Sequence, residues 1–350
     1  MTRAPGREAP LVFSLRFNND LPYRRYQQVA VAAEQFGFDQ LWISHDLFLR
    51  SAPVLLAALA SQTERLGLGT CILNPYQASA AEIGMHAATL HEVTGGRFLL
   101  GVAAGAGDFL DWIGIEQQRP LRRMDETLQV LRRLLRGEVA DLDGDELRWS
   151  REAYLRFRPE VDRAAADIPI YLGANGPKML ELAGAAADGV LPLLFPPEHY
   201  HTVRPLIAKG EERREAELGA VDVAACVWLS LGSDREAARR CLAEKVAYYG
   251  HSLSPLIFER LGLERDDFTE VFDLATRGGD LEAAAGRVSD TMLRIGIAGA
   301  EEEVIGRLGA LVEGGVTHVS FGPPLGPDPL EAMEILARRV MPALRERAPS

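Results

Sequence analysis

A glycine-rich turn stands between an apolar run and a helical pattern, at a place where a chain can bind an anion. The segment GANGPK at 173–178 follows the apolar run IPIYLG at 168–173. Free N–H groups and the dipole at a helix N-terminus favour negative charge, and glycine lets the backbone approach a ligand. The lysine of this segment lacks the neighbours that a nucleotide-binding P-loop requires. From spacing alone, a tight strand-to-helix turn without a ligand stays as the alternative.

Charged side chains that could assist proton or hydride transfer follow the first two apolar runs. Arg16 lies near the end of LVFSLRF at 11–17, and the pair His45–Asp46 follows DQLWIS at 39–44. A histidine or a carboxylate can exchange a proton with a substrate, whereas a guanidinium stays charged and orients or stabilises an anion. For the pair, a solvated loop or a helix cap is the alternative. For Arg16, the alternative is a simple ion pair with Asp46 or Asp20.

Cysteines and histidines give little indication of nucleophilic or metal chemistry. The three cysteines, Cys71, Cys226 and Cys241, are odd in number and have no metal-type spacing, which is typical of a reduced, cytoplasmic protein. No histidine lies near Cys71 in sequence, so a buried apolar role is expected rather than a nucleophile. His199 and His201 are two residues apart and do not share a helix face. A surface helix start is therefore expected there, and no metal site.

Composition limits the classes of partner. The chain has 350 residues, of which 47% are hydrophobic, enough for a large core. Its formal net charge is -12 and it contains no basic block, which argues against nucleic acid. The first ten residues lack the apolar segment of a secretory signal, and no apolar run approaches the roughly 20 residues of a membrane span. A small-molecule substrate is the remaining expectation.

Eight apolar runs alternate with amphipathic stretches and must position these side chains. The expected strands are 11–17, 39–44, 66–70, 97–103, 168–173, 189–193, 223–231 and 317–321. The expected helices are 22–36, 53–63, 78–92, 121–136, 176–187, 197–218, 234–249, 300–313 and 328–346. Eight such units in about this length predict an α/β fold of the (β/α)₈ barrel type. A doubly wound sheet is the alternative, but its glycine fingerprint is missing after the first strand.

Two insertions interrupt the alternation. One is the charged segment 137–167 before the fifth strand, and the other is 250–296 after the seventh helix, with several short helix-like pieces. Long insertions often form lids or binding loops. Barrels of this size often form one domain, so we expect residues 1–350 to form a single barrel domain. The active site of a barrel lies at the C-terminal ends of its strands, where all the candidates above fall.

Five segments, in a recognisable order, resemble a known superfamily. They are GLGTCILNPYQAS, GRFLLGVAAGAGDFLDWIGIE, PIYLGANGPKMLELAGAAADGVL, SPLIFERLGLE and VTHVSFGPPLGPD. Together they resemble the bacterial luciferase-like flavin and deazaflavin superfamily. Within it, the sequence is most similar to the methylenetetrahydromethanopterin reductases, which use the deazaflavin coenzyme F420. The resemblance covers about residues 11–346, and 168–191 with GPPLGPD are its most specific parts.

The resemblance implies a barrel that holds F420 at its C-terminal mouth. In similar proteins, a turn after the fifth strand holds the coenzyme phosphate, and it matches Gly173, Ala174, Asn175, Gly176 and Pro177, followed by Lys178. The stretch Cys71–Ile72 matches a non-prolyl cis peptide that backs the ring of the coenzyme. Gly105, in GVAAGAG, is expected to line the same pocket. The insertion 250–296 is expected to shape it.

The sequence departs from the family pattern in three places. Relatives carry a carboxylate at the position of Arg16, and Asp-His or Glu-His where this chain has His45–Asp46. Glu181 stands where relatives have a lysine that contacts phosphate in some members, and Lys178, one turn earlier, is the expected substitute.

The resemblance implies a cytoplasmic, homo-oligomeric oxidoreductase. It would transfer a hydride between F420 and an organic substrate, with pterins and folates among the candidate substrates. Arg16, His45 and Asp46 are the expected catalytic residues. Two alternatives stay open: an FMN-dependent monooxygenase of the same superfamily, and a flavin-binding barrel that has lost its catalytic groups.

Overall fold

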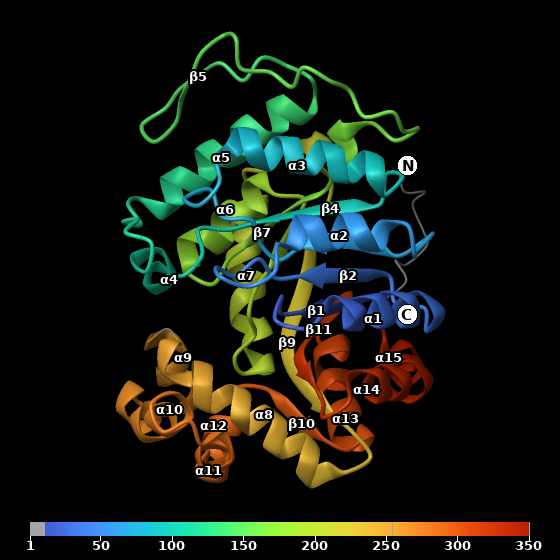
Figure 1. Cartoon of the computed structure of the whole chain (residues 1–350), viewed down its shortest axis with the longest axis vertical. Coiled ribbons are helices and arrows are strands. Elements are labelled where there is room, and N and C mark those ends of the chain that lie inside the picture. The colour runs from blue at the N-terminus through green and yellow to red at the C-terminus, as the bar shows by residue number, and fades with distance from the viewer. Residues whose placement is uncertain (1–10, 254, 350) are drawn as a thin grey trace.

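Eight parallel strands close into a barrel (Figure 1). The computed structural model describes residues 11–253 and 255–349. The barrel strands are β1 (Val12–Phe17), β2 (Gln40–Ile43), β3 (Gly67–Thr70), β4 (Phe98–Val102), β7 (Ile170–Gly173), β8 (Gly189–Leu191), β9 (Asp222–Leu231) and β11 (His318–Leu325). They pair in that order, and β11 pairs with β1 to close the ring. The predicted (β/α)₈ barrel is confirmed, and the doubly wound alternative is wrong.

Helices follow the strands and pack on the outside of the barrel. They are α1 (Tyr23–Gln35), α2 (Ala52–Ala60), α3 (Ala80–Val93), α5 (Pro120–Leu135), α6 (Pro177–Ala186), α7 (Tyr200–Glu211), α8 (Arg235–Tyr249), α13 (Glu301–Glu313), α14 (Pro329–Ile335) and α15 (Met341–Arg347). Capping side chains begin α3, α8 and α14: Ser79, Asp234 and Asp328 each accept a backbone N–H of the first turn at 3.0–3.2 Å. The helix predicted over 197–218 ends earlier, at Glu211.

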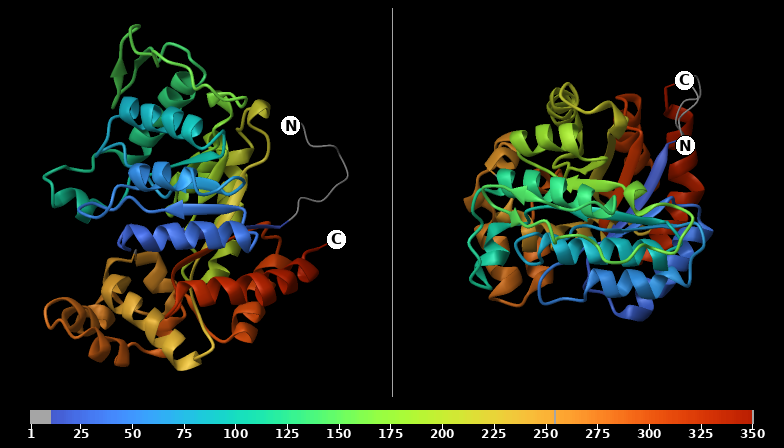
Figure 2. Two further views of the ribbon diagram at one scale, coloured as in Figure 1. Left: turned by 45° about the vertical axis from the view of Figure 1, so that its right-hand side comes forward. Right: turned by 90° about the horizontal axis from the view of Figure 1, so that it is seen from above.

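The two insertions lie at opposite ends of the molecule (Figure 2, left). Segment 137–167 contains a small hairpin, β5 (Leu142–Asp143) and β6 (Arg148–Trp149), and a short 3-10 helix at Ala165–Asp167. Segment 250–296 contains α9 (Pro255–Leu261), α10 (Thr269–Thr276), α11 (Leu281–Gly286) and α12 (Asp290–Leu293). After it, β10 (Ile297–Gly299) pairs with residues 229–231 at the end of β9. The second insertion is thereby held beside the C-terminal mouth of the barrel.

Large side chains fill the inside of the barrel. Trp42, Leu99, Tyr171 and Leu191 form a cluster that water does not reach. Gly69 gives the indole its space, because a Cβ at this position would lie 2.3 Å from Cε3 of Trp42. The interior is therefore a packed core, and chemistry is confined to the loops at its ends.

A buried polar chain crosses the N-terminal end of the barrel. Nδ1 of His318 lies 2.7 Å from a carboxylate oxygen of Asp222, and Nε2 lies 2.8 Å from Oγ of Ser14. Tyr171 donates its hydroxyl to the same carboxylate at 2.6 Å. The order Ser–His–Asp is that of a hydrolase triad, but Ser14 and His318 are fully buried. No substrate can reach the serine, so we assign these residues to the stability of the core.

Candidate active site at the barrel mouth

Arg16, near the end of β1, is a buried cation with an unused hydrogen-bond donor. Its side chain is 6% exposed, and Nη2 donates to Val227 O at 3.3 Å. Nε has no hydrogen-bond partner, and no described carboxylate lies within ion-pair distance. The simple ion pair with Asp46 or Asp20 is therefore wrong. A buried unsatisfied N–H is costly, so this donor fits a ligand that brings an anionic or carbonyl oxygen.

His45 lies in the loop between β2 and α2 and caps the helix. Its Nδ1 accepts the N–H of Ala52, the first residue of α2, at 3.1 Å. Because Nδ1 accepts, Nε2 carries the proton of the neutral ring. Burial lowers the pKa of His45, and the nearby His86 lowers it further. The capping alternative thus holds for Nδ1, while Nε2–H remains a neutral donor.

Asn19 fixes the loop that carries Asp46. Its fully buried amide donates to the carbonyls of Asp46 at 3.0 Å and Arg50 at 2.7 Å, and it accepts from the N–H of Asp46 at 3.3 Å. The carboxylate of Asp46 is reached by solvent, yet the surrounding protein raises its pKa by desolvation. The charge of Lys245 acts in the opposite direction, and that of Asp20 raises the pKa further.

The peptide bond Cys71–Ile72 is cis, so the geometry predicted at this position is confirmed. Ile72 lies beside the glycine-rich turn, because a Cβ at Gly173 would meet Cγ2 of Ile72 at 3.5 Å and Cβ of Ala103 at 2.9 Å. Burial raises the pKa of Cys71 to about 12, although Arg16 opposes the shift. The thiol is therefore protonated at neutral pH, as expected of an apolar residue rather than a nucleophile.

Gly105 is needed for the shape of the loop after β4. Its φ is 72°, and a Cβ there would lie 2.4 Å from Nδ2 of Asn74. That amide donates to Ala104 O at 2.9 Å, which joins the loops after β3 and β4. Whether Gly105 also contacts a cofactor is a prediction that stays open to test.

The turn after β7 leads into an open helix start. Gly176 precedes α6 without any capping side chain, and a Cβ built on it meets no atom within 4 Å. No described group accepts the N–H of Lys178 or Met179 in the first helical turn. Gly176, Pro177 and Lys178 are exposed, whereas Ala174 is buried. This part of the turn has the free donors and the space that an anion requires.

Asn175 and Glu181 have structural partners near the same turn. Oδ1 of Asn175 accepts the N–H of Leu193 at 3.0 Å, which ties the turn to the loop after β8. Glu181 pairs with Lys209 on α7 at 2.7 Å. The carboxylate of Glu181 is therefore paired with a neighbouring helix. Lys178 is the only lysine at the start of α6.

Lys245, on α8, is a mouth residue that sequence reasoning missed. Its Nζ lies 4.8 Å from the ring centre of Trp228 on β9 and 4.5 Å from that of Tyr249. Burial lowers the pKa of Lys245 to about 8, while the charges of Asp20 and Asp46 partly offset the shift. One signal was available, because only three of the 38 basic residues are lysines: Lys178, Lys209 and Lys245.

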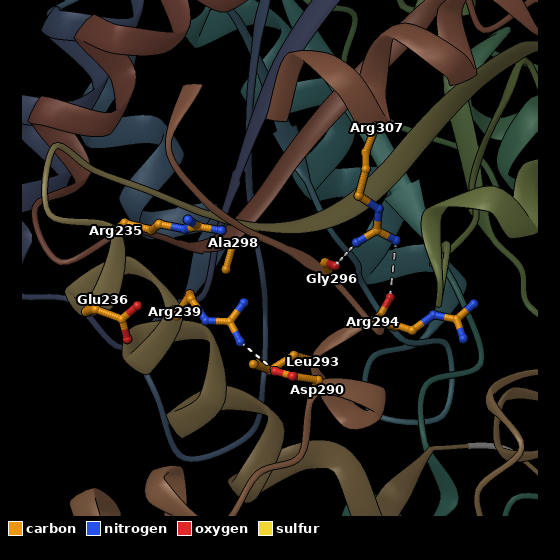
Figure 3. A pocket seen from close by; sticks show the side chains of 9 residues that line it. All are labelled: Arg235, Glu236, Arg239, Asp290, Leu293, Arg294, Gly296, Ala298 and Arg307. Atoms are coloured by element: carbon orange, nitrogen blue, oxygen red, sulfur yellow. Dashed lines mark hydrogen bonds and ion pairs between the residues drawn. The ribbon is translucent and has the colours of Figure 1, made fainter. Parts of the chain in front are cut away.

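A hollow of about 590 Å³ lies outside the mouth, between α8, α12 and α13 (Figure 3). Four arginines line it, and three of them are paired with carboxylates. Arg239 binds Asp290 at 2.6 Å, and Arg307 binds Glu198 at 2.9 Å as well as Gly296 O. Arg235 pairs with Glu303. Arg294 forms no ion pair with a described residue, and its charge lowers the pKa of Glu198. We assign this hollow to the attachment of the second insertion.

The described residues contain no group of three His, Cys, Asp or Glu side chains that could hold a metal ion. His199 is buried, not on the surface as expected, and burial lowers its pKa to about 4, with Arg260 adding to the shift. No helix in residues 11–253 and 255–349 is long and apolar enough to cross a membrane.

The fold and the mouth geometry agree with one family. The sequence profile described as "Luciferase-like monooxygenase" matches residues 8–318. The chain belongs to this family. The resemblance expected from the five sequence segments is thus confirmed.

The chain is similar to F420-dependent enzymes in both sequence and fold. It is 33% identical, over 95% of its length, to 99% of a 5,10-methylenetetrahydromethanopterin reductase of Archaeoglobus fulgidus. It is 29% identical to an F420-dependent glucose-6-phosphate dehydrogenase of Nakamurella multipartita, over 91% of both chains. Among solved structures, the coenzyme F420-dependent tetrahydromethanopterin reductase of Methanopyrus kandleri superposes with a TM-score of 0.84, at 27% identity, over 96% of this chain and 100% of that one.

Proposed function

We propose that this protein is an F420-dependent oxidoreductase that transfers a hydride between the deazaflavin coenzyme and a small organic molecule. The observation that carries the proposal is the similarity over nearly the whole chain to F420-dependent enzymes, both in sequence and in fold. The mouth supports it independently. The cis peptide follows β3, the open start of α6 follows β7 and the unpaired donor of Arg16 lies near the end of β1, so all three occur at the same end of the barrel.

The residues of the mouth fit the coenzyme. The free N–H groups at 178–179, with the Lys178 ammonium, would hold its phosphate. Ile72 and the packed barrel interior below it offer an apolar support for the ring. When bound, F420 supplies a carbon that accepts or donates hydride and reacts poorly with oxygen. The chain then contributes orientation and the exclusion of water.

The substrate side is built from Arg16 and His45. The buried guanidinium can stabilise negative charge on an oxygen or nitrogen, and it cannot give up its proton near neutral pH. The neutral His45 can donate a hydrogen bond from Nε2. A carbonyl or imine compound matches these donors, and pterin or folate derivatives carry such groups. Asp46, at the rim, is proposed to interact with the distal part of the substrate.

An FMN-dependent monooxygenase is the second candidate, because the family description names that activity. The two differ in their use of oxygen. We expect the protein to oxidise reduced F420 anaerobically when a suitable pterin or carbonyl compound is present, and to consume no oxygen with reduced FMN. Oxygen uptake with reduced FMN would favour the monooxygenase. F420 binding without turnover of any compound tested would favour the barrel that has lost its catalytic groups.

We further infer one barrel domain, a homo-oligomer and a cytoplasmic location. Exposed apolar side chains support the oligomer: Phe48 is 73% exposed, Val54 on α2 is 68% exposed, and Met85 on α3 and Trp112 are also exposed. A soluble monomer seldom keeps so many large apolar groups in water. The free cysteines support the cytoplasm. Recovery of the protein from the periplasm or medium after cell fractionation would contradict that location.

A further inference from the structure

We propose that the ammonium of Lys245 donates the proton that accompanies hydride transfer, and that its amine accepts that proton in the reverse direction. The inference rests on the proposed function and adds to it a residue, a role and a direction of proton movement. Neither Arg16 nor His45 can fill this role near neutral pH. The guanidinium does not release its proton, and the histidine is neutral with Nδ1 occupied by the cap of α2.

The position of Lys245 is built by two aromatic rings. Trp228 and Tyr249 contact the ammonium by cation–π interactions at 4.8 and 4.5 Å. The side chain is partly buried, and no hydrogen bond or ion pair within 4.0 Å joins Nζ to a described residue. The rings thus hold the group in place without using its three N–H donors. These donors remain available to a substrate atom.

The charges around Lys245 come from different elements of the mouth. Asp20 follows β1, Asp46 follows β2, and both favour the ammonium. The charge of Arg16 on β1 lowers the pKa of Lys245. Cys241 on α8, like the two carboxylates, raises it, and its effect is the smallest. The Tyr249 hydroxyl stays neutral, because burial raises its pKa to about 12. Partial burial outweighs the carboxylates, so the ammonium releases its proton more readily than an exposed lysine does.

The composition of the chain adds an independent argument. Thirty-eight residues are lysine or arginine, and only three of these are lysines. For a cation that only stacks on aromatic rings, arginine is the more usual choice, because its planar group stacks well and stays charged. A lysine differs in that burial can bring its pKa close to neutral. This chain uses that residue type at the mouth, between two rings.

The proposed step balances as follows for a carbonyl or imine substrate. A hydride from reduced F420, which is thereby oxidised, forms a C–H bond at the electrophilic carbon. The π electrons of the C=O or C=N bond move to the heteroatom, which takes a proton from Nζ of Lys245. The neutral amine regains its proton from water when the product leaves. Arg16 stabilises the charge that develops before the proton arrives.

The state of the amine can be tested without any cofactor or turnover. The purified protein is treated with trace acetic anhydride between pH 6 and 11, and the acetylated peptides are measured by mass spectrometry. We expect the reactivity of Lys245 to titrate near pH 8. Lys178, which is exposed, is the internal reference. A titration of Lys245 at or above that of Lys178, or no reaction at any pH, would overturn the proposal.

Two substitutions separate proton donation from charge. Lys245→Arg keeps the charge but cannot release a proton, and Lys245→Met removes both. We expect each to lower kcat of the reduction on the order of 100-fold, the usual scale of general acid catalysis, with F420 affinity within about twofold of the parent. The parent rate should fall as the pH rises above about 8, and both variants should lose that dependence. Lys209→Arg and Lys209→Met, on α7, are the controls.

The outcomes distinguish this inference from the proposed function. If Lys245→Arg keeps the parent kcat and pH profile, the charge alone suffices and proton donation by Lys245 is wrong. If the parent protein binds no F420, the proposed function fails instead. The acetylation experiment could then still show that the amine titrates near neutral pH. The proposal that Lys245 donates a proton in this reaction would nevertheless be wrong, because the reaction itself would not occur.

Discussion

Arg16 shows how a single side chain can be tested apart from the cofactor. Arg16→Met keeps the apolar stem and removes the buried guanidinium with its unpaired Nε. Loss of one donor to a developing negative charge usually costs on the order of 100-fold in kcat. We therefore expect kcat of the reduction to fall by about that factor, with F420 affinity nearly unchanged, in steady-state kinetics combined with fluorescence titration. Arg24→Met, on the exposed side of α1, is the matched control. Parent kcat in Arg16→Met would remove this residue from the mechanism.

Gly176 tests the anion site at the start of α6. A side chain there meets no protein atom within 4 Å, and the backbone φ is -80°, so Gly176→Val should fold normally. The new methyl groups would occupy the space above the free N–H groups. We expect F420 affinity to fall at least tenfold, about 1.4 kcal/mol, in a fluorescence titration. Gly306→Val, on the exposed face of α13, is the control. Unchanged affinity in a folded Gly176→Val protein would place the phosphate elsewhere.

Single residues were predictable from the sequence where local chain geometry determines their role. The helix start at Pro177 follows from a short motif, whereas the cis bond at Cys71–Ile72 was predictable only from the resemblance to the family. Lys245 was missed because its position depends on how α8 packs across the mouth, and no local pattern reports that packing. The cap that His45 forms on the N–H of Ala52 was predictable only as an alternative, because a helix cap and a catalytic histidine have the same local sequence.

At the scale of elements, the eight strand–helix units were predictable because each has a long, regular apolar pattern. The exceptions are short. β10 has three residues and exists because it pairs with the end of β9, a long-range contact. α4 (Gly107–Asp111) has five residues and no apolar periodicity that could be recognised. In 250–296, the pattern indicated short helices but not that Arg307 on α13 holds the end of this segment by donating to the carbonyls of Gly296 and Arg294.

The exposed apolar side chains on α2 and α3 predict an interface between copies of the chain. The two helices pack side by side and present Val54 and Met85 to solvent, while the rings of Phe48 and Trp112 contact each other nearby, 6.3 Å apart. We expect light scattering to show an oligomer, and Val54→Glu with Met85→Glu to shift it toward the monomer, because buried like charges without partners are unfavourable. Val139→Glu, at an exposed apolar site outside α2 and α3, should not. A parent protein that is monomeric at all concentrations would contradict the inference.

At the scale of the whole molecule, the barrel explains why residues far apart in sequence meet at one end. The closed sheet places the C-terminal ends of β1, β2, β3 and β7 around the same opening, and β10 keeps the second insertion beside it. The sequence alone could therefore predict the opening from the order of its elements. It could not predict the buried, unpaired state of Arg16, which depends on the packing of β1 against β9 and β11.

The central claim is that this mouth is built for F420 rather than FMN. Equilibrium titration tests it most directly: the quenching of F420 fluorescence by the protein is compared with that of FMN in the same buffer. The account predicts saturable binding of F420 at least tenfold tighter than that of FMN, a difference of about 1.4 kcal/mol. Gly176→Val should weaken F420 binding in the same experiment. Equal or tighter binding of FMN, or no saturable binding of F420, would contradict the account.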